Sequence, residues 1–379
     1  MSRNNKTILF VVNAPEFFLS HRLPLAMAVK EAGYKVHVAS AYGPAIGTLK
    51  ALGYECHIIP FARSGQNLLN ELKTLLLLLR LFRNIKPDLI HLITIKPVLY
   101  GGLAARIARI GAVVSAVSGL GTVFLANSLG ARLRRLLVMR LYTAAFRQKR
   151  LAVIFQNPDD RDILLNFCCL RVSEVRMIRG SGVALRDYPY LPEPDGKPVV
   201  VMAARLLKDK GVLDFVEAAK LLKGRGIDVQ MRLIGSLDQG NPTSITQQDL
   251  DRWKKDNSID VLGFRKDIAE QYAASNIVCL PSYREGLPKS LVEAAACGRA
   301  VVTTDVPGCR DAIIPDVTGI LVPVRNSLAL ADAIKKLIED SEARKRMGLA
   351  GRLLAEQTFS IEKIVEQHMA IYKELLPDG

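Results

Sequence analysis

The feature that most constrains the fold is a strand and helix alternation that runs along the chain and begins anew after one interruption. Short β-branched apolar runs predict strands at 6–12, 35–40, 55–59, 88–93, 112–117, 151–155 and 174–178. A second series follows at 199–203, 228–234, 259–262, 277–280, 300–303 and 320–322. Such alternation forms parallel sheets with helices on both faces. The sequence therefore predicts an α/β protein with two Rossmann-like, doubly wound domains facing a cleft.

The interruption between the two series is a segment rich in proline and glycine, residues 180–198. A chain of 379 residues is long enough for two domains of ordinary size. We place the domains at residues 1–185 and 186–358 and predict a separate amphipathic C-terminal helix within 359–379.

The formal charge of +15 is concentrated in the first half of the chain. Residues 1–190 hold 26 Lys and Arg against 10 Asp and Glu, a net +16, and the remaining 26 and 27 give −1. No acidic residue lies between Asp88 and Asp159, an interval with ten basic residues. A basic surface of this kind attracts nucleic acid, anionic lipid or a phosphorylated substrate.

Other features indicate a cytoplasmic protein. The six cysteines lack the spacing of a metal site and are expected to be buried free thiols in a reducing compartment. The N-terminus runs into a strand without a signal-peptide pattern. The leucine-rich segment 68–82 is interrupted by Glu71, Lys73 and Arg80, so we expect a core-facing helix there and no membrane span.

The stretch 283–298 combines a loop, a helix start and two carboxylates. It follows the expected strand 277–280, and Pro288 suits the first position of the next helix. A helix N-terminus offers backbone N–H groups and a positive dipole end to a diphosphate. Glu285 and Glu293 would repel phosphate, so they are expected to face hydroxyl groups. A loop charge and a solvated helix residue would show the same pattern.

A second constellation follows the first strand of the second series. Arg205 and Lys210 are five residues apart across a turn and can converge on one anion, with Lys208 as a third candidate. An ordinary charged turn would contain the same residues.

Glu285-x7-Glu293, with Gly286 and Pro288 between, together with Arg205-x4-Lys210, resembles the signature of the retaining GT-B glycosyltransferases of family 4. The resemblance covers nearly the whole chain and implies a C-terminal helix that crosses back onto the first domain. It implies catalytic roles for Arg205 and Lys210 at the donor diphosphate and for Glu285 near the donor sugar, with Glu293 on the ribose hydroxyls. The nucleotide-sugar contacts that it implies are Gly235, Gly263, Phe264, Gly286, Leu287, Pro288, Ser290 and Glu293.

In the first domain the resemblance is to bacterial transferases that add N-acetylhexosamine to an undecaprenyl-diphosphate-linked sugar. It rests on the approximate motif F-x-x-x-R near residues 17–22 and on the loop 118–121. The acceptor-binding residues that it implies are Phe17, His21, Arg22, Ser118 and Gly119. A helix-start pair exposed to water is the alternative for His21 and Arg22. Many family members carry a histidine where this chain has Ser118, so we assign no general base.

We therefore expect retaining transfer of a sugar, N-acetylhexosamine from UDP, onto a polyprenyl-diphosphate-linked saccharide at the cytoplasmic membrane face. We identify no Asp-x-Asp metal motif of the GT-A kind, and we predict no metal and no cofactor besides the UDP-sugar substrate. The basic segment 129–150 is predicted to be a helix on anionic membrane, with a solvated or inter-domain helix as the alternative. A sugar-nucleotide 2-epimerase and a non-catalytic polyanion or nucleic-acid binder are the rival functions, and we expect no nucleic acid as partner.

Overall fold

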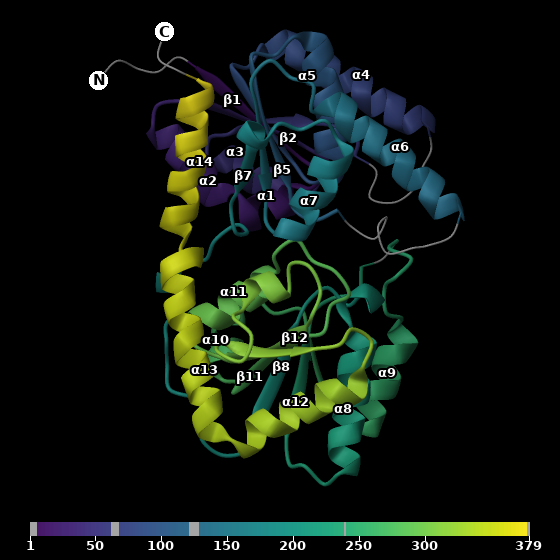
Figure 1. Cartoon of the computed structure of the whole chain (residues 1–379), viewed down its shortest axis with the longest axis vertical. Coiled ribbons are helices and arrows are strands. Elements are labelled where there is room, and N and C mark those ends of the chain that lie inside the picture. The colour runs from purple at the N-terminus through teal and green to yellow at the C-terminus, as the bar shows by residue number, and fades with distance from the viewer. Residues whose placement is uncertain (1–5, 62–67, 121–128, 239, 377–379) are drawn as a thin grey trace. The chain divides into compact units, whose positions relative to one another are not determined.

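A computed structural model describes residues 6–61, 68–120, 129–238 and 240–376 of the chain (Figure 1). The chain divides into two compact units. Unit 1 consists of residues 1–181 and 362–379, and unit 2 of residues 182–361. Each unit is built around its own parallel sheet.

The sheet of unit 1 has seven parallel strands in the order β3-β2-β1-β4-β5-β6-β7. Its central strands β1, β4 and β5 are mostly apolar and almost wholly buried, because helices cover both faces of the sheet and leave no solvated side. The strands are β1 (Thr7–Val12), β2 (Lys35–Ser40), β3 (Glu55–Ile58), β4 (Leu89–Ile93), β5 (Ala112–Val117), β6 (Leu151–Phe155) and β7 (Val175–Met177). The main helices are α1 (Pro15–His21), α2 (Leu23–Glu31), α3 (Ala45–Ala51), α4 (Leu68–Ile85), α5 (Gly102–Ala108), α6 (Leu129–Ala145) and α7 (Pro158–Phe167).

The sheet of unit 2 has six parallel strands in the order β10-β9-β8-β11-β12-β13. The strands are β8 (Val199–Ala203), β9 (Gln230–Ile234), β10 (Asp260–Gly263), β11 (Ile277–Leu280), β12 (Ala300–Thr304) and β13 (Gly319–Val322). The helices are α8 (Val212–Gly224), α9 (Gln247–Asp256), α10 (Ile268–Ala273), α11 (Lys289–Ala296), α12 (Ser327–Glu339) and α13 (Ser341–Leu354). Two doubly wound parallel sheets confirm the predicted fold class.

Both sheets reverse their strand order next to the first strand of the unit. In unit 1 the reversal lies between β1 and β4, and in unit 2 between β8 and β11. Ligands of open α/β sheets bind outside the carboxyl ends of the strands at such a reversal, because the adjoining loops turn away in opposite directions. In unit 2 these loops are the ones that carry Arg205, Lys210 and Glu285.

The C-terminal helix α14 (Ile361–Leu375) belongs to unit 1, which confirms that it crosses back. Ile364, Ile371 and Tyr372 are buried in the same core as the strand β1. The Tyr372 hydroxyl lies 2.5 Å from Nδ1 of His91 in β4, and Lys6 Nζ donates to the Leu376 carbonyl at 3.3 Å. Apolar burial and these polar contacts therefore attach the last helix to the first domain.

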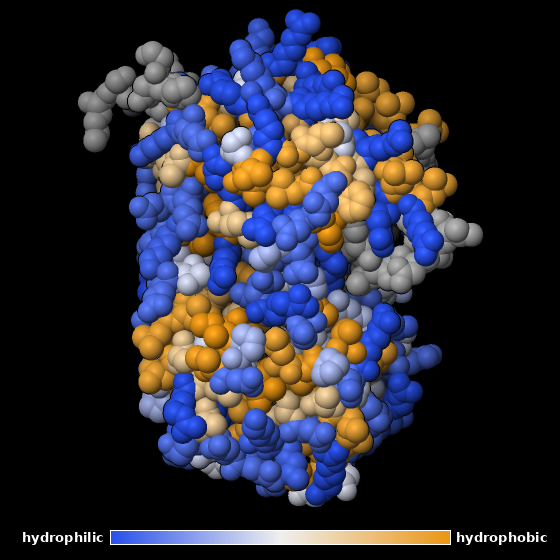
Figure 2. Space-filling view, viewed as in Figure 1, coloured by the Kyte–Doolittle hydropathy of each residue, from blue (hydrophilic) through white to orange (hydrophobic). Residues whose placement is uncertain are grey.

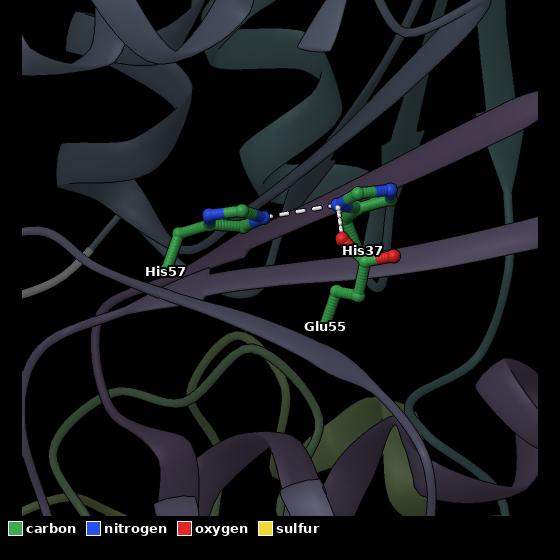
Figure 3. A group of neighbouring side chains, drawn as sticks. All are labelled: His37, Glu55 and His57. Carbon is green, nitrogen blue, oxygen red and sulfur yellow. Dashed lines mark hydrogen bonds and ion pairs between the residues drawn. The ribbon is translucent and has the colours of Figure 1, made fainter.

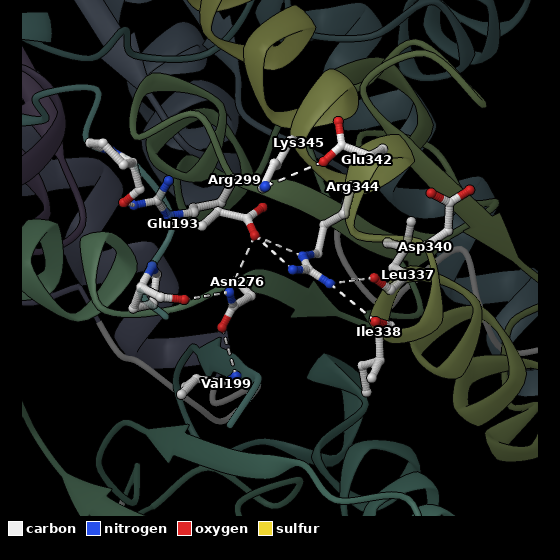
Figure 4. Close-up of polar contacts among 12 residues, drawn as sticks. Glu193, Val199, Asn276, Arg299, Leu337, Ile338, Asp340, Glu342, Arg344 and Lys345 are labelled. Carbon is white, nitrogen blue, oxygen red and sulfur yellow. Dashed lines mark hydrogen bonds and ion pairs between the residues drawn. The ribbon is translucent and has the colours of Figure 1, made fainter. Parts of the chain in front are cut away.

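The proline-rich segment between the two series is packed onto unit 2 (Figure 4). Glu193 forms an ion pair with Arg344 at 2.8 Å, and both side chains are only 7% exposed. Asn276 Nδ2 also donates to the Glu193 carboxylate at 3.2 Å, and Arg299 Nη1 donates to the Leu191 carbonyl at 2.8 Å. Removing one member of such a buried pair would leave an uncompensated charge, so this segment has a fixed position on unit 2.

Three local predictions were wrong in detail. Serine is a good helix N-cap, so the sequence predicted that the first helix begins at about Ser20. The helix α1 instead begins at Pro15, because proline suits the first turn of a helix and α1 starts directly after the loop that follows β1. The helix α6 ends at Ala145, and Arg150 instead donates from Nε to the Gly111 carbonyl. Pro288 is the residue that precedes the first turn of α11 and is not within it.

No helix within the described ranges combines the length and the apolar character that crossing a bilayer requires. The leucine-rich helix α4 instead buries Leu78 and Phe82 in the core of unit 1.

Candidate active site

The residues that the sequence assigns to donor binding all lie at the carboxyl edge of the unit 2 sheet. Arg205 and Lys210 follow β8, Gly235 follows β9, and the loop that begins with Pro281 follows β11. Gly263 is the last residue of β10, and Phe264 comes next. Because all these strands are parallel, their ends open on one side of the sheet. The topology therefore brings together segments that are up to 90 residues apart in the sequence.

Lys210 and Glu285 form the central contact of this edge. Lys210 Nζ lies 2.5 Å from Glu285 Oε1, and Ser282 Oγ donates to the same oxygen at 2.7 Å. The side chains of Lys210 and Glu285 are 21% and 11% exposed. Partial burial strengthens this ion pair relative to one on the surface, while both groups stay reachable from solvent. The site thus holds a cation, a carboxylate and a hydroxyl in one cluster.

Two glycines let the neighbouring loops approach this pair. Gly211, with a φ of +75°, lies so close to Pro281 that a Cβ would come within 2.0 Å of the Pro281 carbonyl oxygen. Gly308, with a φ of +82°, lies against Glu285, and its Cβ would come within 2.5 Å of the Glu285 carbonyl oxygen. Backbone bonds also fix the loops, with Tyr283 N donating to the Asp209 carbonyl at 2.9 Å. The pair is therefore held by backbone on both sides.

Glu293 is almost fully buried and already has partners. Its Oε1 accepts a hydrogen bond from the Tyr188 hydroxyl at 2.5 Å and lies 3.2 Å from Lys289 Nζ. Only 7% of Glu293 is exposed. Burial, and then the Glu293 charge, raise the pKa of Tyr188 well above its usual range, so the hydroxyl stays protonated as a donor. These contacts fix the orientation of the carboxylate.

Arg205 contacts a different carboxylate from the one that Lys210 contacts. Its Nη1 donates to Asp238 Oδ2 at 3.0 Å, and its side chain is 62% exposed. Asp238 also accepts a hydrogen bond from Asn241 Nδ2 at 3.3 Å. The two cations that the sequence expected on one anion are thus held by two different carboxylates, Asp238 and Glu285. Arg205 retains the exposure that a surface anion would need.

The ends of β9 and β10 are joined by their backbones. Gly235 N donates to the Gly263 carbonyl at 2.9 Å, and Phe264 is 68% exposed beside this bond. Asp267 precedes α10, but its carboxylate accepts from Arg265 and Gln271 and not from the helix backbone. An aspartate at this position is typical of a helix cap, and the sequence predicted one here, but this described residue forms no side-chain cap. The hydrogen bond from Arg265 lowers the pKa of Asp267 well below its usual range.

The loop from Gly286 to Pro288 leads into α11. Leu287 and Pro288 are buried, and Ser290 is half-buried in the first turn. Pro288 gives α11 no side-chain cap in this described segment, and its carbonyl accepts from Leu291 N at 3.1 Å. The start of α11 thus presents its positive dipole end close to Glu285 in the chain.

In unit 1 the acceptor candidates separate into an accessible pair and a buried residue. The rings of Phe17 and His21 stack in α1 with their centres 4.1 Å apart, and Ser20 Oγ lies 2.6 Å from His21 Nδ1. Arg22 is only 3% exposed. Burial lowers the pKa of Arg22 to about 10, and its Nε has no hydrogen-bond partner among the described residues. The alternative for His21 and Arg22 was a pair of side chains exposed to water, and the burial of Arg22 excludes it for that residue.

Ser118 and Gly119 follow β5 at the carboxyl edge of the unit 1 sheet. Ser118 Oγ is buried without a hydrogen-bond partner in the described part of the chain, and Gly119 has a φ of +106°. Gly121, the last residue of the expected loop, lies outside the described residues.

Sequence reasoning missed Ser282, Tyr188, Asp238 and Gly308. Ser282 follows β11 by two residues, and that position could have indicated it. Tyr188 lies in the proline- and glycine-rich segment between the two strand series, 105 residues from Glu293, and no pattern in the sequence connects the two. Asp238 and Gly308 likewise act through contacts between separate loops.

The comparisons with known proteins agree with this arrangement. Residues 188–354 match the family model described as glycosyl transferases group 1, and residues 7–157 match the one described as glycosyl transferase 4-like. The chain is 30% identical to the N,N'-diacetylbacillosaminyl-diphospho-undecaprenol alpha-1,3-N-acetylgalactosaminyltransferase of Campylobacter jejuni, over 95% of this chain and 98% of that protein. The chain belongs to the family 4 glycosyltransferases. The family prediction is therefore confirmed.

One further relative and one solved structure are similar to this glycosyltransferase. It is 27% identical to the capsular polysaccharide biosynthesis glycosyltransferase CapM of Staphylococcus aureus, over 91% of each chain. It has the fold of Anabaena HepE, crystallised in complex with UDP, with a TM-score of 0.77 and 20% identity over 97% of this chain and 100% of that one. The family-model match at residues 7–157 lies within unit 1, and the match at residues 188–354 lies within unit 2.

Proposed function

We propose that this glycosyltransferase moves N-acetylhexosamine from UDP onto a polyprenyl-diphosphate-linked saccharide at the cytoplasmic membrane face, with retention of configuration and without a metal. The observation that carries the proposal is the contact of Lys210 with Glu285 at the strand-order reversal of unit 2. It holds a cation for the diphosphate beside a carboxylate for sugar hydroxyls. The printed activity of the Campylobacter jejuni relative supports the choice of donor sugar and acceptor.

We assign each residue at the carboxyl edge of the unit 2 sheet to a part of the UDP-sugar donor, in agreement with its contacts. Lys210, and Arg205 from its exposed position, stabilise the charge that grows on the departing UDP. Glu293, oriented by Tyr188, accepts the ribose hydroxyls. The HepE complex supports UDP as the nucleotide. Gly235, Gly263 and Phe264 line the nucleobase end of this edge, with Phe264 exposed for a base to stack on.

The transfer step needs no side-chain nucleophile. The bond between the anomeric carbon and the diphosphate oxygen breaks, and UDP leaves with the electron pair. The acceptor hydroxyl attacks from the same face and gives its proton to the departing diphosphate oxygen. Glu285, held by Ser282 and Lys210, orients the sugar during this step. Cation and helix charges take the role that a metal has elsewhere.

For the membrane, we propose that α6 and α4 of unit 1 dock on anionic lipid. Three leucines of α6 are exposed by 53–70%, and three of α4 by 52–75%: Leu133, Leu136 and Leu137, and Leu69, Leu72 and Leu76. The same α6 segment exposes Arg132, Arg134 and Arg140. Figure 2 shows hydrophobic and hydrophilic side chains interspersed over this part of unit 1. Each basic residue near an anionic surface contributes about 1 kcal/mol.

Sedimentation with liposomes tests the docking. Binding should need anionic lipid, weaken with salt, and fall when Arg132, Arg134, Arg135 and Arg140 are changed to Gln. The matched control changes four lysines of unit 2, Lys220, Lys335, Lys336 and Lys345, to Gln and should bind like the parent. Equal loss in both variants, or binding indifferent to lipid charge, would contradict docking through α6.

The two rival functions are not favoured by the relatives. The Campylobacter jejuni and Staphylococcus aureus proteins carry glycosyltransferase names over nearly their full lengths. Free UDP together with a glycoside product, in place of an isomerised donor, would exclude the epimerase. Filter binding of nucleic acid with and without UDP-sugar would test the polyanion binder.

The decisive assay is UDP release from a panel of UDP-sugars with and without membrane extract that contains lipid-linked saccharides. UDP-N-acetylhexosamine should be consumed only with the extract, and nuclear magnetic resonance of the product should show the donor's anomeric configuration. Turnover should persist in EDTA. An inverted product would contradict retention, and turnover restored only by added Mg²⁺ or Mn²⁺ would contradict metal independence.

A further inference from the structure

Two histidines and a glutamate meet on the outer strands of the unit 1 sheet (Figure 3). His37 Nδ1 lies 2.9 Å from His57 Nε2 and 3.4 Å from Glu55 Oε2. One ligand atom from each residue lies within 4.8 Å of the others. Among the described residues, this is the only group of three His, Cys, Asp or Glu side chains with such proximity.

The sheet register produces this cluster. His37 in β2 is paired with Glu55 in β3, and His57 lies two residues beyond Glu55. Side chains alternate between the faces of a strand, so Glu55 and His57 point to the same side, and the register places His37 on that side as well. Cys56, between them, points to the opposite face. The three side chains therefore come from backbone that the sheet holds rigid.

We propose that His37, Glu55 and His57 bind a divalent transition-metal ion of the Zn²⁺ class. Tetrahedral Zn²⁺ has ligand bonds of about 2.0–2.1 Å, which puts neighbouring ligand atoms about 3.3–3.4 Å apart. The 3.4 Å between His37 Nδ1 and Glu55 Oε2 meets this value, and the two imidazole nitrogens need to separate by only a few tenths of an ångström. Two His and one carboxylate form a common zinc ligand set with one position left for water.

The protonation states suit a metal. Burial lowers the pKa of both His37 and His57, so both rings are neutral near pH 7 and offer a lone pair. The hydrogen bond from Lys35 lowers the pKa of Glu55, which keeps its carboxylate ionised. The geometry stands without these shifts, and their direction implies that the imidazoles take up protons, and that binding weakens, only at a pH lower than the one at which an ordinary histidine is protonated.

Lys35 is the competitor for the glutamate. Its Nζ lies 2.8 Å from Glu55 Oε1, and both side chains are more than half exposed. A surface ion pair of this kind is weak, so a metal at Oε2 can displace or share the carboxylate. Removing the ammonium should therefore tighten metal binding, a response that a purely structural histidine pair would not show.

A metal here would join β2 to the edge strand β3. It would act on the stability of unit 1 and not on the transfer step, so the proposal is compatible with turnover in EDTA. Edge strands have one row of backbone groups without a strand partner, and a bridging ion would protect this one from opening.

The test uses the full chain without a polyhistidine tag, stripped with EDTA and titrated with Zn²⁺ against a chromophoric chelator. We expect one Zn²⁺ per chain and a higher melting temperature in its presence. His57→Gln and Glu55→Gln should each weaken binding about tenfold or more and abolish the temperature shift, by loss of a ligand. Lys35→Met should strengthen binding, and Co²⁺ should give the visible absorption of a tetrahedral site.

Two controls separate this site from other zinc binding. Glu362→Gln removes an exposed carboxylate outside the cluster, and Cys169→Ser removes the one described cysteine that is exposed. Both should bind like the parent. No uptake of Zn²⁺, or uptake that survives His57→Gln and Glu55→Gln in variants with the parent's circular dichroism spectrum, would overturn the proposal. Uptake lost only in Cys169→Ser would overturn it as well.

Discussion

Replacing Lys210 by Met separates its structural contact from its proposed role in the reaction. The change removes the ammonium that lies 2.5 Å from Glu285 and leaves Ser282 as the side-chain donor to that carboxylate among the residues that the structure describes. In the proposed transfer step the change also removes the positive charge that would stabilise the departing UDP. The first effect changes the free energy of unfolding, and the second changes the rate of turnover.

The magnitudes of the two effects differ. Exposed ion pairs couple by about 0.2–1 kcal/mol, and removing one member of a fully buried pair costs about 3–5 kcal/mol. With side chains 21% and 11% exposed, the pair lies between these limits, so we expect Lys210→Met to cost about 1.5–3 kcal/mol of stability. The lost stabilisation of leaving-group charge should lower kcat by a factor of about 10²–10³, with a much smaller change in the Kd for UDP.

The double variant Lys210→Met with Glu285→Gln distinguishes the two effects. It removes the unpaired charge, so urea unfolding should show most of the lost stability restored, while UDP release stays low. Lys220→Met, a lysine on the exposed side of α8, is the charge-matched control and should behave like the parent. Parent-like turnover in a destabilised Lys210→Met would refute the catalytic role, and equal losses in kcat and UDP affinity would reduce it to docking.

Two further predictions concern Glu293 and the buried histidines. Glu293→Ala should weaken UDP binding by about 1.5–3 kcal/mol in calorimetry, because it removes the carboxylate that we propose accepts the ribose hydroxyls. Tyr188→Phe keeps this carboxylate and should change the affinity about threefold or less. Unchanged UDP affinity in a folded Glu293→Ala would remove Glu293 from the site. Burial lowers the pKa of His368 to about 3 and that of His91 well below its usual range, so below pH 6.5 the unfolded chain binds protons that the folded chain does not. The free energy of unfolding should therefore fall as the pH is lowered from 7 to 5.5, and protonation of His368 in the unfolded chain accounts for about 1.3 kcal/mol of this fall. In urea unfolding over the same pH interval, His368→Gln should lose about 1.3 kcal/mol less stability than the parent. Identical losses in parent and variant would show that His368 does not carry the effect.

The sequence by itself determined the architecture, because the βα alternation is a local pattern that each segment carries independently. Continuous apolar runs such as Ile277–Leu280 predict strands buried on both faces, and the structure places this one so. The spacing of Glu285 and Glu293 around a helix start determined the family, since strand, loop and helix follow one another within 20 residues. These features need no knowledge of distant contacts.

The tertiary structure decided the partners of the same residues. Lys210 and Arg205 are close in the sequence, yet each is held by a different carboxylate, because two loops return to this edge from other strands. Tyr188 reaches Glu293 across 105 residues, and His37 meets His57 through the register of β2 and β3. Packing also decided the exposure of Arg22: the sequence allowed a water-exposed helix start as the alternative to acceptor binding, whereas the structure buries this side chain in unit 1. Contacts between segments distant in the chain depend on register and packing, which a local pattern does not specify.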